Sequence, residues 1–185
     1  MTLHWLVAIG VISQIILGLW MIDIPKVPAG VRAYWFNLHK SIGLTLALLI
    51  VMRLSWRLTH PPPPLPSTLP RWQLRAAGIS HWLLYACMIT MPLAGYLGST
   101  FSGYPIRYFG LALPAWGWKD DMLKDFFSTV HLVAAIVFIA LIKLHILAAL
   151  KHLWIDRDGV FHRMLPRRRP AASGPQPTVV PGQGV

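Results

Sequence analysis

The chain has 185 residues, of which 55% are hydrophobic and 12% are charged, and its mean hydropathy is +0.54. This composition excludes an ordinary water-soluble domain, because the apolar runs are long enough to span lipid. The formal net charge is +11, but the basic residues cluster at the ends of apolar runs, which indicates membrane topology and contact with anionic lipid rather than nucleic acid.

Four apolar segments predict four transmembrane helices, because each has the length needed to cross the hydrocarbon core. The spans cover about residues 3–21, 38–57, 80–98 and 126–153. The first span lacks a positively charged leader and is longer than the apolar part of a typical signal peptide, so we expect it to be retained. In the third span, Pro92 is followed by Gly95 and Gly98, which predicts a kink or a close helix contact.

The remaining segments are predicted to be connectors and a tail. The connector after the second span carries a run of prolines between residues 61 and 70, which favours a stiff extended spacer. Residues 170–185 are rich in proline, glycine, serine and alanine, so we expect a disordered tail after one domain over residues 1–169. The single cysteine, Cys87, lies in an apolar run and predicts a buried thiol rather than a disulfide.

The connectors also predict the orientation in the membrane. One side collects Arg53, Arg57, Arg71, Arg75, Lys151, Arg157, Arg163 and Arg167 to Arg169. The other side collects fewer basic residues, offset by four aspartates: Lys26, Arg32, Lys40, Arg107, Lys119 and Lys124, with Asp23, Asp120, Asp121 and Asp125. By the positive-inside rule, both termini are predicted to be cytoplasmic.

Histidines inside the spans are the main functional signal, because polar groups in a membrane are costly and usually functional. His131 and His145 share nearly the same face of the fourth span and lie about 21 Å apart along its axis. This spacing suits two redox centres stacked across a bilayer. The predicted topology places His39 at the level of His131, and His4 at the level of His145, where His81 is the competing residue.

Haem b fits two such pairs better than zinc does. Haem iron takes two axial imidazoles, whereas structural zinc prefers four ligands that include thiolate or carboxylate. Gly43, one turn after His39, leaves room for a flat macrocycle or for a packed helix. Arg53 projects at the level of His145, where it either pairs with a haem propionate or anchors the span beside Arg57.

Two further histidines keep several interpretations open. His81 begins the third span, where it is an axial ligand, a quinone-site residue or an interfacial histidine. His152 follows His145 by seven residues and lies at the predicted cytoplasmic edge. There it either delivers protons to a quinone or is merely interfacial.

These features together resemble the bacterial cytochrome b561 family, over roughly residues 3–169. The residues that carry the resemblance are His4-Trp5-Leu6, His39 with Gly43 and Arg53, His81, the pair His131 and His145, and the closing Phe161 to Pro166 followed by arginines. The family is similar in fold to the membrane cytochrome subunits of nickel hydrogenases and formate dehydrogenases.

The resemblance implies an all-α integral membrane four-helix bundle that encloses two b-type haems in a bacterial inner membrane. It pairs His39 with His131 and His4 with His145, and it implies that His81 is not a ligand. Relatives exchange electrons with membrane quinone near the cytoplasmic haem, and superoxide has been proposed as a periplasmic electron donor for the family.

The leading hypothesis is therefore a di-haem electron carrier and oxidoreductase. It would connect ubiquinone with a periplasmic donor or acceptor, either superoxide or a small soluble protein. No catalytic side chain is expected, because bis-histidine iron transfers electrons without an open coordination position. One alternative is a cytochrome b anchor subunit of a periplasmic dehydrogenase. A histidine-based metal or proton transporter is a weaker alternative, because the spans lack carboxylates.

Overall fold

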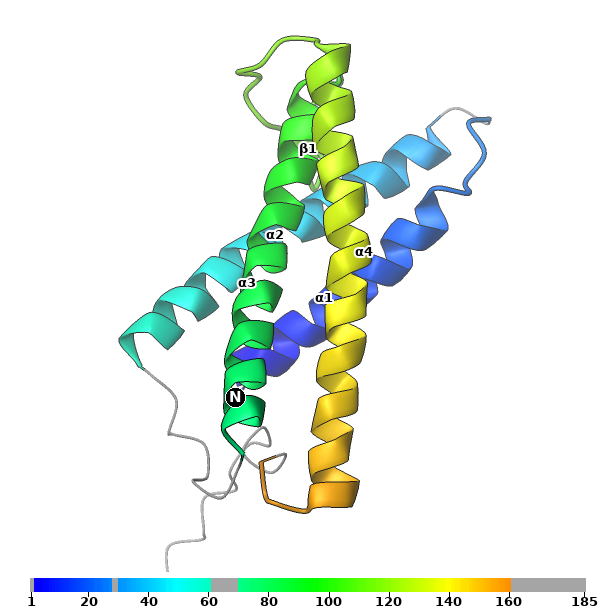
Figure 1. Cartoon of the computed structure of the whole chain (residues 1–185). Helices are drawn as coiled ribbons and strands as arrows, with labels where there is room; N and C mark the ends of the chain where they lie inside the picture. The colour runs from blue at the N-terminus through cyan, green and yellow to red at the C-terminus, as the bar shows by residue number, and fades with distance from the viewer. Residues whose placement is uncertain (1, 28–29, 61–69, 161–185) are drawn as a thin grey trace, which may run out of the picture.

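Four long helices dominate the computed structural model, which describes residues 2–27, 30–60 and 70–160 (Figure 1). The helices are α1 (Thr2–Met21), α2 (Val31–Thr59), α3 (Arg71–Thr100) and α4 (Asp121–Lys151). Within the described residues, these four are long and apolar enough to cross a membrane. The all-α four-helix fold class predicted from the sequence is confirmed.

α1, α2 and α3 contain their predicted spans and continue beyond them, whereas α4 begins before its predicted span and ends at Lys151, two residues short of the predicted end. α3 begins at Arg71, directly after Pro70, and α4 begins at Asp121, where the Asp120 side chain accepts a hydrogen bond from the Leu123 N–H at 3.0 Å. At its other end α4 continues into the short π-helix η1 (His152–Asp156). The predicted bounds follow apolar residues alone, whereas backbone hydrogen bonding extends into the polar ends of the helices. The predicted proline spacer lies almost wholly outside the described residues, and the predicted tail lies entirely outside them.

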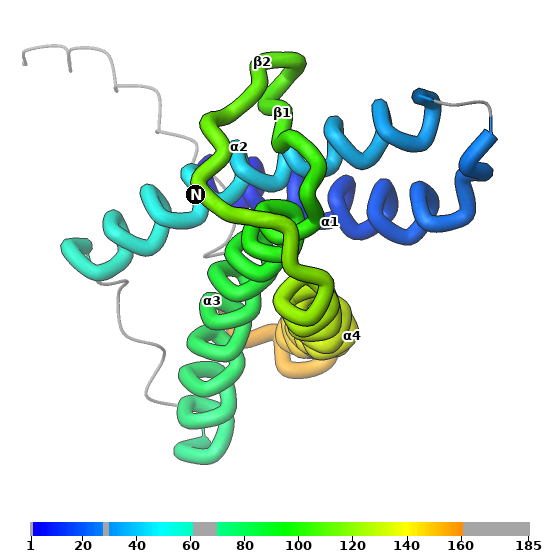
Figure 2. The backbone as a smooth tube through the Cα atoms, turned by 90° about the horizontal axis from the view of Figure 1, so that it is seen from above, coloured from blue at the N-terminus to red at the C-terminus, as the bar shows by residue number. Residues whose placement is uncertain are grey.

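The helices form two antiparallel pairs that cross each other (Figures 1 and 2). α3 and α4 lie side by side along their length, α1 packs on α2, and α2 also contacts α3. We call the end of the bundle where α1 begins and α4 ends the terminal end. The opposite end, which carries the α3–α4 connection, is called the ribbon end.

A small β-ribbon in the α3–α4 connection gives the ribbon end its structure. β1 (Arg107–Tyr108) pairs antiparallel with β2 (Leu111–Ala112), across a turn in which Phe109 and Gly110 have φ values of 47° and 94°. The buried Ser41 hydroxyl of α2 accepts a hydrogen bond from the Phe109 N–H at 2.9 Å. The ribbon, which the sequence analysis did not predict, is thereby attached to α2.

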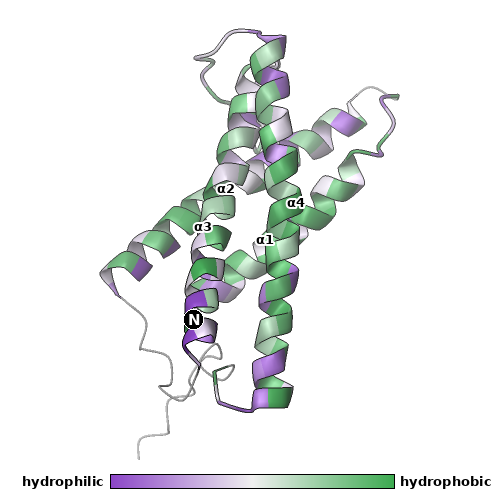
Figure 3. Cartoon of the chain, viewed as in Figure 1, coloured by the Kyte–Doolittle hydropathy of each residue, from purple (hydrophilic) through white to green (hydrophobic). Residues whose placement is uncertain are grey.

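Apolar side chains fill the bundle and also cover its outside. The core cluster draws on all four helices: Val7, Val11, Leu46, Ile50, Tyr85, Met88 and Phe138. Many large apolar side chains point outward, for example Ile9, which is 63% exposed. In Figure 3 the middle of the bundle is largely hydrophobic, and hydrophilic residues gather toward the helix ends. Helices that are apolar all round are expected where lipid, not water, surrounds the protein.

The expected close contact near Pro92 is confirmed. A Cβ atom added at Gly98 would lie 3.5 Å from the Ser128 hydroxyl, and one added at Gly95 would lie 3.1 Å from the Nδ1 atom of His131. Glycine therefore lets the backbone of α3 approach the side chains of α4.

Candidate functional site

His39 of α2 and His131 of α4 face each other toward the ribbon end. Their ring centres lie 6.5 Å apart, and their planes meet at 74°. Two imidazole nitrogens that each lie about 2 Å from one metal ion place the ring centres roughly 6 Å apart. The spacing of this pair therefore fits one metal ion between the two rings, as axial ligation of haem iron requires.

The His131 ring is oriented by α3. Its Nδ1 atom lies 2.9 Å from the Met91 carbonyl oxygen, and the missing side chain of Gly95 lets the ring rest against the α3 backbone. Metal-bound histidines typically donate one ring N–H to a carbonyl and ligate through the other nitrogen. A bond from Nδ1–H to Met91 leaves Nε2 as the ring nitrogen available to a metal ion.

The His39 ring is placed by α1 in a similar way. A Cβ atom at Gly18 would lie 3.3 Å from a carbon of the His39 ring. The Nδ1 atom of His39 is buried and has no hydrogen-bond partner among residues 2–27, 30–60 and 70–160. A buried polar atom without a partner costs free energy, so this nitrogen is a feature that a bound group or water would account for.

Gly43 lies one turn further along α2. No atom of another element lies within 4 Å of the position that a Cβ atom would take there. The glycine is therefore not explained by close helix packing in this structure. Its predicted use, to leave room for a macrocycle, remains a prediction.

A second cluster lies toward the terminal end and takes one basic residue from each helix. It consists of His4 of α1, Arg53 of α2, His81 of α3 and His145 of α4. The rings of His81 and His145 are 5.6 Å apart, centre to centre. His4 and Arg53 are close enough to interact electrostatically with both of these histidines. The structure thus brings together the four residues that the sequence analysis placed at the level of His145.

His4 and His81 differ in how their ring nitrogens are satisfied. The His81 side chain lies within reach of the Ala77 backbone, one turn earlier in its own helix. The Nδ1 atom of His4 is buried without a hydrogen-bond partner. His4 therefore has the unmet polar group, although His81 has the closer ring contact with His145.

Tyr85 is part of this end of the bundle and was missed by the sequence analysis. The guanidinium carbons of Arg53 and Arg57 each lie 5.6 Å from the centre of its ring. The residue is 4% exposed, and no described residue hydrogen-bonds to its hydroxyl. Its position one turn after His81 on the same helix is the sequence signal that could have identified it.

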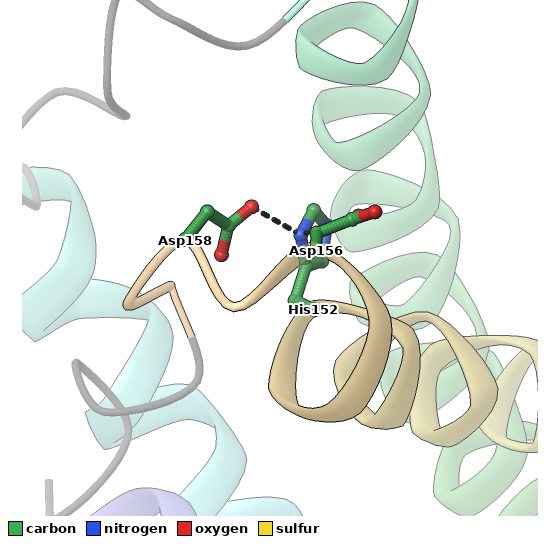
Figure 4. Close-up of side chains that lie close together, drawn as sticks. All are labelled: His152, Asp156 and Asp158. Atoms are coloured by element: carbon green, nitrogen blue, oxygen red, sulfur yellow. Dashed lines mark hydrogen bonds and ion pairs between the residues drawn. The ribbon is translucent and has the colours of Figure 1, made fainter.

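His152 belongs to a charged network beyond the last turn of α4 (Figure 4). Its Nδ1 atom lies 2.6 Å from Asp158 Oδ2 and 3.3 Å from Asp156 Oδ2, and Lys151 pairs with Asp156 at 2.5 Å. Burial disfavours the charged form of Asp158, but hydrogen bonds from the Val160 N–H and the His152 side chain outweigh it and hold the pKa of this carboxyl below its usual value. The sequence analysis identified His152 but neither of its acidic partners.

Comparison with known proteins finds relatives along almost the whole chain. The family model of prokaryotic cytochrome b561 matches residues 1–167. Cytochrome b561 homolog 2 of Escherichia coli (strain K12) is 39% identical over 168 residues, which cover 88% of this chain and 86% of that protein. Probable superoxide oxidase CybB of Yersinia pestis is 28% identical over 169 residues, which cover 90% of this chain and 93% of that protein.

Proposed function

The chain belongs to the prokaryotic cytochrome b561 family, and on this premise we propose that it passes electrons between membrane quinone and a periplasmic redox partner through two b haems. Membership makes the protein a multi-pass membrane electron carrier with b-type haem. The number of haems, their ligands, the orientation and the two partners are the substance of the proposal.

The observation that carries the proposal is the facing pair of His39 and His131, with ring centres 6.5 Å apart. These two residues would be the axial ligands of the first haem. A haem held by two histidines supplies one-electron ferric–ferrous chemistry without an open coordination position. The Met91 carbonyl orients His131, and Gly18 and Gly95 let both rings lie close to neighbouring backbones. The protein's own contribution would thus be to hold two imidazole rings in position for the haem iron.

His4 and His145 would ligate the second haem, as the family resemblance implies. The Nδ1 atom of His4, buried without a hydrogen-bond partner among the described residues, supports this assignment, because a bound group would account for it. His131 and His145 are separated by about 21 Å along α4, which would put one haem toward each membrane surface. His81 would then serve the quinone side of this cluster.

The ribbon end would face the periplasm and receive the soluble partner. Lys119 pairs with Asp121 and Lys124 pairs with Asp125. These two lysines therefore contribute little to the positive electrostatic potential at the ribbon end. Within the described residues, Lys40 beside His39 and the exposed Arg107 of β1 have no ion pair. Their positive charge would attract a small anion such as superoxide or an acidic face of a soluble protein. One relative is named as a probable superoxide oxidase, which favours superoxide.

The terminal end would face the cytoplasm and exchange electrons with quinone. Reduction of a quinone to a quinol consumes two electrons and two protons, so this side needs groups that exchange protons with water. His152, hydrogen-bonded to Asp158 at 2.6 Å, is such a group at the helix end. His152 and His81 are therefore the residues that we assign to proton supply and to the quinone site.

Haem analysis and rapid kinetics on the purified full chain test this proposal. We expect a b-type spectrum on reduction, two haems per chain by the pyridine haemochrome assay, and stopped-flow reduction of the haems by both quinol and superoxide. Added superoxide dismutase should abolish only the second reaction. A haem-supplemented preparation without b-type bands, or one that neither donor reduces, would contradict the proposal.

A further inference from the structure

Tyr85 is buried in a way that its own surroundings do not explain. It belongs to the core cluster and is 4% exposed, yet its hydroxyl group has no hydrogen-bond partner in the part of the chain that the structure describes. A buried hydroxyl that has lost water and gained no partner destabilises the folded protein. Phenylalanine would fill the same space without this cost, so the hydroxyl itself requires a reason.

Arg53 and Arg57 beside it carry two positive charges that no acidic side chain of the protein neutralises. Both guanidinium groups lie 5.6 Å from the Tyr85 ring centre. The chain has six acidic residues, all described by the structure, and none pairs with either arginine. Two partly buried cations over the ring of a tyrosine whose hydroxyl is unpaired within the described residues form a set of groups suited to an anion.

We propose that Tyr85 donates a hydrogen bond to a haem propionate that Arg53 and Arg57 hold by charge. This inference rests on the proposed function, because it assumes a haem in the cluster of His4 and His145. A carboxylate accepts several hydrogen bonds at once, and guanidinium groups supply them in fixed geometry. One phenol and two guanidinium groups are thus a matched donor set for one carboxylate.

The depth of the site distinguishes a propionate from a lipid phosphate. Tyr85 packs among Val7, Ile50 and Phe138, which come from the other three helices. A phospholipid headgroup lies outside such a core, whereas a haem held between α1 and α4 reaches it from within. Arg53 also interacts with His4 and His145, so the donor set and the proposed iron ligands share one space.

The test is Tyr85→Phe in the full-length holoprotein, with Tyr34→Phe as a control because Tyr34 is 62% exposed on α2. We expect Tyr85→Phe to keep both haems. Its loss of a hydrogen-bond donor should lower the midpoint potential of one haem and leave the other unchanged, because the propionate charge is then less well neutralised. Redox-difference infrared spectra with carbon-13 in the propionate carboxylates should show a shifted carboxylate band only in this variant.

A second pair of variants covers the case in which Tyr85→Phe fails to fold. Arg57→Gln should lower the potential of the same haem, and Arg57→Lys, which retains the charge, should restore most of it. Two bound haems with unchanged potentials and carboxylate bands in Tyr85→Phe or Arg57→Gln would overturn the inference while leaving the proposed function intact. Loss of a bound phospholipid with unchanged propionate bands would also overturn it. A wild-type protein without haem would instead refute the proposed function.

Discussion

At the scale of single residues, the histidines of the two clusters differ in how firmly the protein holds them. The His131 ring is fixed by the Met91 carbonyl and by the backbone at Gly95. His39 and His4 each keep a buried Nδ1 atom without a partner. The cluster toward the terminal end holds three histidines, so residue spacing alone does not identify its ligand pair. Substituting each histidine in turn identifies which two of the three bind the haem.

The ligand assignment predicts which substitutions remove a haem. His145→Ala and His4→Ala should each reduce the haem content from two per chain to one, because bis-histidine iron is not retained by a single imidazole. His81→Ala should retain both haems and slow only the reaction with quinol. Pyridine haemochrome assays per chain and stopped-flow traces measure these effects. Loss of a haem in His81→Ala, with both haems kept in His4→Ala, would assign the ligand to His81 instead.

At the scale of elements, the contact between α3 and α4 depends on the absence of side chains on α3. A Cβ atom at Gly95 would lie 3.1 Å from His131 Nδ1, closer than ordinary van der Waals contact, whereas one at Gly78 on the same helix would meet nothing within 4 Å. Gly95 is therefore tied to the position of the His131 ring, and Gly78 is not.

These two glycines predict opposite outcomes for the same substitution. Gly78→Ala should raise the helix stability by up to about 1 kcal/mol, the usual gain in propensity, and retain both haems. Gly95→Ala should cancel that gain, because the His131 ring must move and its hydrogen bond to Met91 lengthens. We expect a lower haem occupancy in Gly95→Ala alone, measured by haem content and thermal unfolding. Equal occupancy and stability in the two variants would contradict this role of Gly95.

The elements that the sequence analysis missed are the β-ribbon and η1. The ribbon has only two residues in each strand, too short for an alternating pattern to stand out. It is held to α2 by Ser41 and by a hydrogen bond between Thr45 and Tyr108. These contacts join residues more than sixty positions apart, which no local pattern reports.

At the scale of the whole molecule, the basic residues predict that the terminal end faces the cytoplasm. Single cysteines in a Cys87→Ser background test this with a membrane-impermeant maleimide. Tyr104→Cys, in the exposed α3–α4 connection, should be labelled from the periplasm in spheroplasts. Arg71→Cys, at the exposed start of α3, should be labelled only after permeabilisation. The reverse pattern would invert the orientation and would move the proposed quinone side to the periplasm.

The sequence by itself determined the four membrane spans, the family and the levels of the histidines, because each depends on local hydropathy or on helical spacing within one segment. It also placed Arg53 at the level of His145, where the structure finds it among His4, His81 and His145. Only the tertiary structure decided which side chains meet across helices. Helix rotation and packing bring His39 and His131 together, with ring centres 6.5 Å apart, and place two arginines over the buried Tyr85 ring. The path of the chain beyond α4 brings the aspartate partners to His152. The pattern of residues within one helix contains no information about contacts with other segments.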